Sequence, residues 1–176
     1  MSVGRKLPAL DTATRLVEPF LSAVRRAVAG HPRVVVLYSG GLDSTLLAEC
    51  LRDVRPTLFS VGVPGASDLA AASTGASGLG LHHAMCEVIV HDVEMAIERF
   101  GSDIETLREP YRSVAVAEAI SLLRAPPGLL VTGQGADELF HGYAHFRGLS
   151  LADRLSRASA DLERLTEHEW PRFQRM

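Results

Sequence analysis

The segment VVVLYSGGLDSTLLAECL, residues 34–51, joins a short apolar run to a glycine turn and then to a second apolar pattern. The apolar run, residues 34–38, is typical of a strand buried on both faces, whereas the apolar residues after Leu42 recur at helical spacing. A strand that passes through two glycines into a helix forms a cradle for anions, because glycine leaves backbone N–H groups accessible and the helix start is electropositive. The segment therefore predicts a strand–loop–helix unit whose turn binds an anionic ligand.

The rest of the sequence predicts a parallel sheet that is covered by helices on both faces. Continuous apolar runs alternate with helical patterns, which is typical of an α/β protein. The predicted strands are residues 33–38, 57–63, 83–90 and 129–133, and the predicted helices are residues 11–29, 42–53, 68–80, 93–100, 113–123 and 149–167. We expect a single domain over residues 1–176, with residues 168–176 as a disordered tail.

The amino-acid composition limits the kinds of protein that this chain can be. The 176 residues, 47% of them hydrophobic, suffice for one substantial core, and no apolar run reaches the length of a membrane span. The net charge is −3 and the basic residues are scattered, so neither a nucleic acid nor a membrane is an expected partner. Cys50 and Cys86 belong to no CxxC pair, which argues against a disulfide framework and a thiolate zinc site. We therefore expect a cytoplasmic protein.

A second glycine loop, VTGQGADELFHGY at residues 131–143, repeats the arrangement of the first. A predicted strand leads into two glycines, and Asp137 and Glu138 follow at a helix start. Because parallel strands end at one edge of the sheet, we expect Asp43 and Asp137 to lie near each other. Two carboxylates there are suited to share a metal ion that is bound to a polyphosphate.

Simpler interpretations exist for each loop taken alone. SGGLDS is also compatible with a tight turn in which Ser and Asp cap the helix, and acidic residues in a first helical turn commonly complement the helix dipole. The Walker phosphate loop is excluded, because its lysine and its spacing are absent. Asp43 beside phosphates is repulsive unless a cation such as Mg²⁺ lies between them, so the two loops together favour a metal–polyphosphate site.

Three segments resemble one known family. SGGLDST, residues 39–45, resembles the signature of the PP-loop ATP pyrophosphatases, and residues 131–143 resemble the second motif of their asparagine synthetase and β-lactam synthetase branch. Residues 59–83, FSVGVPGASDLAAASTGASGLGLHH, resemble the strand, the Asp-containing helix and the paired histidines of that branch. The resemblance implies a Rossmann-like, adenine nucleotide alpha hydrolase-like fold. It also implies an ATP-dependent carbon–nitrogen ligase, in which a carboxylate attacks the α-phosphorus of ATP, pyrophosphate leaves, and an amine then displaces AMP.

The resemblance also implies a set of site residues. The implied pyrophosphate residues are Ser39, Gly40, Gly41, Asp43 and Ser44, the implied Mg²⁺ ligands are Asp43 and Asp137, the implied adenosine contacts are Leu37, Val61 and Gly133, and the implied catalytic positions are Asp43, Asp137 and Gln134. Gln134 differs from the family pattern, because most members have a glutamate there that is implicated in acyl transfer. Glutamine cannot act as an acid or a base, so the resemblance alone does not explain the second half-reaction.

Two other functions remain as alternatives to the ligase. One is a nucleotide-binding subunit without catalysis, and the other is a PP-loop sulfur transferase, which the lack of a cysteine in either loop disfavours. The expected partners of the ligase are ATP and a small carboxylate. We also expect a homo-oligomer or a second protein subunit, because the family takes a catalytic lysine from downstream of its second motif and the only lysine here is Lys6.

Overall fold

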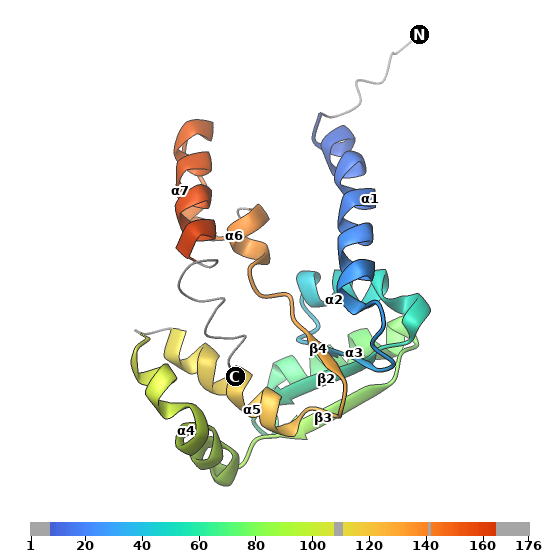
Figure 1. The fold of residues 1–176 in the computed structure, drawn as a ribbon, viewed down its shortest axis with the longest axis vertical. Helices are drawn as coiled ribbons and strands as arrows, with labels where there is room; N and C mark the ends of the chain where they lie inside the picture. The colour runs from blue at the N-terminus through green and yellow to red at the C-terminus, as the bar shows by residue number, and fades with distance from the viewer. Residues whose placement is uncertain (1–7, 108–110, 141, 165–176) are drawn as a thin grey trace.

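Four short strands form one parallel sheet in the order β3-β2-β1-β4 (Figure 1). The computed structural model describes residues 8–107, 111–140 and 142–164. The strands are β1 (Val34–Leu37), β2 (Thr57–Gly62), β3 (His83–Glu87) and β4 (Leu129–Val131). All four predicted strands are therefore present, and each is shorter than its apolar run.

Helices connect the strands, as the α/β pattern predicts. The α-helices are α1 (Pro8–Val28), α2 (Leu42–Cys50), α3 (Ser67–Leu79), α4 (Val90–Glu105), α5 (Tyr111–Arg124), α6 (Ala136–Phe140) and α7 (Leu151–Arg164). Two short 3₁₀ helices, η1 (Arg52–Val54) and η2 (Ala144–Phe146), follow α2 and α6. The predicted tail, residues 168–176, lies outside the described residues.

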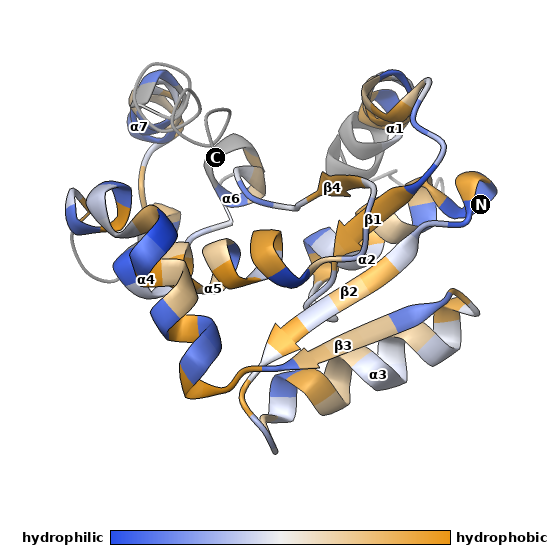
Figure 2. Ribbon diagram, turned by 60° about the horizontal axis from the view of Figure 1, so that its bottom comes forward, coloured by the Kyte–Doolittle hydropathy of each residue, from blue (hydrophilic) through white to orange (hydrophobic). Residues whose placement is uncertain are grey.

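The sheet has a hydrophobic core on each face. On one face, side chains from α1, α2 and α3 pack with Val34, Val36 and Leu58. On the other face, Val35 and Phe59 pack with apolar residues that include Ala125, at the end of α5, and α5 packs in turn on α4. Figure 2 shows the apolar strands between these two helical layers. The expectation of a parallel sheet with helices on both faces is confirmed.

Two helices differ from their sequence predictions for reasons of packing. The predicted helix at residues 93–100 extends over α4, because an Asp92 carboxylate oxygen accepts a hydrogen bond from the Ile89 N–H at 2.9 Å and the buried Ile104 holds the last turn. The glycine-rich α3 forms a complete helix. A Cβ atom at Gly75 would collide with the Tyr38 hydroxyl, so this glycine allows α3 to approach β1 closely.

The order of the strands fixes where a ligand site can form. From β1 the chain runs through β2 to β3 on one side, whereas β4 pairs with the other side of β1, with Val36 opposite Val131. The direction of winding therefore reverses between β1 and β4, which is where ligands bind in open α/β sheets. Both glycine loops begin at this point.

Within residues 8–107, 111–140 and 142–164, no helix combines the length and the apolar character that a bilayer crossing needs.

Candidate functional site

The first loop, residues 39–44, is folded around two serine hydroxyl groups. The Oγ atoms of Ser39 and Ser44 lie 3.2 Å apart, and Ser44 Oγ also donates to the Gly41 carbonyl oxygen at 3.2 Å. Ser39 Oγ accepts the Gly41 N–H at 3.2 Å. Ser44 is buried, whereas Ser39 and Asp43 are exposed. The hydrogen bonds of Ser44 therefore hold the buried side of the loop, and the side that carries Ser39 and Asp43 faces solvent.

The start of α2 has no side-chain cap. Gly41 is its N-cap residue, and no side-chain capping hydrogen bond is formed there. The interpretation of SGGLDS as a turn in which Ser and Asp cap the helix is therefore wrong. The N–H groups of a first helical turn have no partner within the helix. They form an electropositive end to which an anion can bind.

Gly40 explains why the loop is closely packed on its inner side. Its φ of +76° lies in the left-handed region, and a Cβ atom there would lie 3.0 Å from the Cα and N atoms of Ala72 on α3. The backbone of the loop therefore rests directly on α3. A side chain at this position would lift the loop from the helix.

The second loop, residues 132–135, lies against the first. A Cβ atom at Gly133 would lie 3.2 Å from the Cβ of Asp43 and 3.5 Å from the Ser44 nitrogen. Thr132 stabilises the turn, because its Oγ1 accepts the Gln134 N–H at 3.3 Å. Gly133, just after β4, therefore packs directly against Asp43 and Ser44 at the start of α2.

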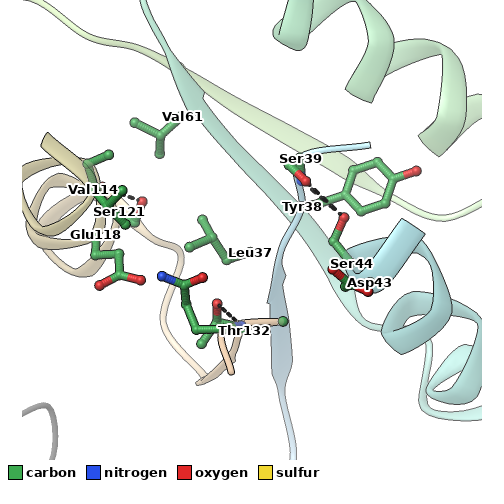
Figure 3. A pocket seen from close by; sticks show the side chains of 13 residues that line it. Leu37, Tyr38, Ser39, Asp43, Ser44, Val61, Val114, Glu118, Ser121 and Thr132 are labelled. Carbon is green, nitrogen blue, oxygen red and sulfur yellow. Dashed lines mark hydrogen bonds between the residues drawn. The ribbon is translucent and has the colours of Figure 1, made fainter. Parts of the chain in front are cut away.

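One pocket of about 290 Å³ lies between these loops and α5 (Figure 3). Most of the residues that the sequence pointed to contribute to its wall. These are Leu37, Ser39, Asp43, Ser44, Val61, Gly133 and Gln134. Gly40 and Gly41 are not among the lining residues of the pocket.

Asp137 lies outside the wall of this pocket. It is half-buried at the second position of α6, and a Cβ atom at Gly142 would collide with its Oδ1 atom. The Gly142 N–H donates to the Asp137 carbonyl oxygen at 3.0 Å. The expected sharing of one metal ion by Asp43 and Asp137 stays a prediction.

The sequence interpretation missed one wall of the pocket, which α5 supplies. The lining residues that it missed are Val114, Ala117, Glu118 and Ser121 on α5, together with Tyr38 and Thr132 at the ends of the strands. Ser121 is buried, and its Oγ donates to the Ala117 carbonyl oxygen at 2.7 Å. The spacing of 114, 118 and 121 is that of one helical face, and this was the signal that could have indicated the wall.

The charged side chains among the described lining residues are two carboxylates, Asp43 and Glu118. In Figure 3, Asp43 lies beside Ser39 and Ser44 at one end, and Glu118 lies at the other end near Val114. Arginine and lysine are absent from the described lining. A polyphosphate in this pocket therefore needs a cation beside Asp43.

The residues present fit a magnesium ion that arrives with its substrate. The described residues contain no group of three or more His, Cys, Asp or Glu side chains arranged to hold a metal ion. Mg²⁺ does not need such a group, because it is usually bound by one or two carboxylates together with substrate phosphates and water. An exposed Asp43 beside the electropositive start of α2 is suited to that arrangement.

Comparisons with known proteins agree with the motifs. A model of the asparagine synthase family matches residues 15–176. The chain is 31% identical to the glutamine-hydrolyzing asparagine synthetase of Gallus gallus over 144 residues, a match that covers 72% of this chain and 25% of that protein. It is 33% identical to a probable asparagine synthetase of Acanthamoeba polyphaga mimivirus over 137 residues, covering 71% of this chain and 24% of that protein. The chain thus spans about a quarter of the length of these curated relatives.

One solved structure matches part of the chain at low identity. The NH3-dependent NAD synthetase from Campylobacter jejuni is 19% identical, with a TM-score of 0.47 over 74% of this chain and 60% of that chain. The family model covers most of the sequence, including both glycine loops and the α5 wall. The chain therefore belongs to the asparagine synthase family.

Proposed function

We propose that this protein uses ATP and Mg²⁺ to activate a small carboxylate as an acyl adenylate and then forms an amide with an amine. The observation that carries this proposal is a pocket lined by both glycine loops, at the point where the sheet reverses its winding. Membership of the asparagine synthase family supports an ATP-dependent amide-forming ligase. The acid and the amine are to be identified by the exchange and transfer experiments described below.

In this proposal the first loop holds the pyrophosphate that leaves. A carboxylate oxygen of the substrate attacks the α-phosphorus, and the bond from that phosphorus to the bridging oxygen breaks, so the electron pair leaves with pyrophosphate. The uncapped N–H groups at the start of α2 serve as donors where negative charge develops, and Ser39 and Ser44 line the pocket beside them. Such preorganised donors are usually the largest source of rate enhancement in reactions of this kind.

The rest of the proposed ATP site follows from the wall of the pocket. Adenosine packs on Leu37 and Val61, while Gly133 keeps the backbone of the second loop accessible. Asp43 holds Mg²⁺, which offsets phosphate charge when bound, and Asp137 joins it as a second ligand. Gly40 acts by letting the loop lie flat on α3, and Gly41 acts by leaving room for the Ser39 hydroxyl, because a Cβ atom there would lie 3.2 Å from Ser39 Oγ.

We also propose that a second copy of the chain or another protein completes the site. A transition state at the α-phosphorus gathers negative charge, and the described lining supplies carboxylates rather than arginine or lysine. In this proposal a basic side chain from a neighbouring subunit supplies the positive charge that stabilises the transition state. Light scattering with and without Mg²⁺ and ATP tests the idea, and a protein that stays monomeric in both states while forming amide alone contradicts it.

Exchange of labelled pyrophosphate into ATP tests the adenylation half-reaction directly. Purified protein is incubated with Mg²⁺, ATP, labelled pyrophosphate and one acid at a time from a panel of amino acids and dicarboxylic acids that includes L-aspartate. We expect exchange with at least one acid and its loss in Asp43→Asn. Absence of exchange with every acid, in protein that binds ATP, favours the alternative of a nucleotide-binding subunit and removes the proposed activity. Cell fractionation tests the accompanying proposal of a cytoplasmic location.

A further inference from the structure

The pocket contains a carboxylate that neither glycine motif includes. Glu118 lies on α5, half-buried, in a helical face that also brings Val114 and Ser121 to the pocket. We propose that Glu118 is the general base for the attacking amine in this protein. This inference rests on the proposed function and names the group that serves its second half-reaction.

The position of Glu118 separates it from the phosphate end of the pocket. Asp43 lies with Ser39 and Ser44 where pyrophosphate is proposed to leave, whereas Glu118 lies at the other end (Figure 3). Gln134 lines the same pocket from the second loop. An amide side chain donates or accepts hydrogen bonds but takes up no proton at neutral pH. Among the described lining residues, Glu118 is therefore the carboxylate placed away from the metal end.

The fold of α5 holds this side chain on the pocket side. The opposite face of the helix buries Ala115, Ala119 and Ile120 against α4. Arg124 at the end of α5 also pairs with the buried Asp92 of α4, with 3.4 Å between Nη1 and Oδ1. Rotation of α5 about its axis would bury charge and expose this apolar face, so Glu118 is kept toward the pocket.

The proposed step balances in atoms and charge. The amine nitrogen attacks the carbonyl carbon of the acyl adenylate and forms the C–N bond, which leaves a positive charge on nitrogen. The Glu118 carboxylate takes one proton from that nitrogen and becomes a neutral carboxylic acid. The carbon–oxygen bond to AMP then breaks, and AMP leaves with the electron pair. Acid–base catalysis of this kind contributes about 10²- to 10⁴-fold in rate.

Separate measurement of the two half-reactions tests this role. Exchange of pyrophosphate into ATP reports adenylation, and AMP-coupled amide formation with ammonium chloride reports transfer, each with the acid that gives exchange in the wild type. We expect Glu118→Gln to keep exchange unchanged and to lower transfer by about 10²-fold or more. We expect Gln134→Glu, added to Glu118→Gln, to recover about tenfold of the lost transfer, because it returns a base to the same pocket.

Two further variants serve as controls for Glu118→Gln. Glu98→Gln removes an exposed carboxylate on α4 that is not part of the pocket, and both half-reactions should stay unchanged. Glu118→Asp keeps the carboxylate and should lose less transfer activity than Glu118→Gln. The rate of transfer should still fall at acidic pH in Glu118→Asp, whereas this fall should be absent in Glu118→Gln. Circular dichroism confirms that each variant is folded.

The outcomes separate this inference from the proposed function. Wild-type protein without exchange for any acid overturns both. Normal exchange and normal transfer in Glu118→Gln overturn the inference alone. Equal loss of exchange and transfer in Glu118→Gln assigns the carboxylate to ATP binding and also overturns its role as the base.

Discussion

A Cβ atom added to Gly133 would lie 3.2 Å from the Cβ of Asp43, so the two glycine loops touch at a position where a side chain would crowd Asp43. Such a distance is closer than ordinary van der Waals contact between carbon atoms. This approach connects the loops that follow β1 and β4, which are almost ninety residues apart in sequence. Both residues line the pocket, so this close approach sets the distance between its two loops.

Gly133→Ala should therefore impair adenylation while leaving the fold intact. The added methyl group must displace the Asp43 side chain by a few tenths of an ångström. A displacement of a full ångström costs about 10²-fold in rate, so a loss on the order of tenfold in pyrophosphate exchange is expected. Gly78→Ala is the matched control, because a Cβ atom at Gly78 meets no other atom within 4 Å. Equal exchange in both variants would show that the loops have room to separate.

Binding of ATP should depend on a divalent cation, and Asp43→Asn should weaken that dependence. Asp43 repels phosphate unless a cation lies between them, and asparagine removes the charge while keeping the shape. Isothermal titration calorimetry with ATP, in the presence of Mg²⁺ or of EDTA, measures the effect. Asp137→Asn should act in the same direction if Asp137 is the second ligand. Equal ATP affinity with and without Mg²⁺ contradicts the assignment of the first loop to a metal-bound pyrophosphate.

Gly75→Ala and Gly78→Ala should have opposite effects on stability although they lie on the same helix. At Gly75 the methyl group collides with the Tyr38 hydroxyl, which is buried and lies 3.3 Å from Thr45 Oγ1, and overpacking of this kind costs about 1–3 kcal/mol. At Gly78 the methyl group enters open space, and the free energy of unfolding should rise by about 0.4–1 kcal/mol. Urea unfolding measures both, and destabilisation by Gly78→Ala would contradict the helical packing of α3.

His83 should make the protein less stable in mild acid. Burial lowers the pKa of His83, and the nearby charge of His82 lowers it further. The folded chain therefore binds fewer protons than the unfolded chain between the two pKa values. The free energy of unfolding should accordingly fall as the pH drops through the usual histidine pKa of 6.5 toward the lower value of the folded state.

His83→Gln should flatten this pH dependence, because the side chain no longer titrates. Its amide still reaches toward Ser60, whose Oγ lies 2.8 Å from His83 Nε2 in the native protein. Midpoints of urea unfolding between about pH 5 and 8 provide the measurement, a range that brackets histidine titration. His31→Gln removes an exposed histidine and serves as the control. A pH slope that is the same in His83→Gln and in the wild type would refute the role of His83.

The sequence by itself determined the order of the elements and the place of the site. Apolar runs and helical spacing are local properties, so they predicted all four strands and most of the helices. Two glycine loops after strands of a parallel sheet predicted the edge at which the candidate site lies, and Leu37, Ser39 and Gly133 do line a pocket there. The helix boundaries were less accurate, because packing rather than propensity extends α4 to Glu105.

Only the tertiary structure decided which further residues meet at that edge. The place of Glu118 depends on the face of α5 that packs on α4, and that choice is made by contacts between distant segments. The same reason explains why α3 keeps its glycines, since the need for Gly75 arises from Tyr38 on another element. It also explains why Asp137 lies outside the pocket wall, although the loop that leads to it begins at the same edge of the sheet. Local sequence patterns encode the elements, whereas the neighbours of each side chain depend on how the whole chain packs.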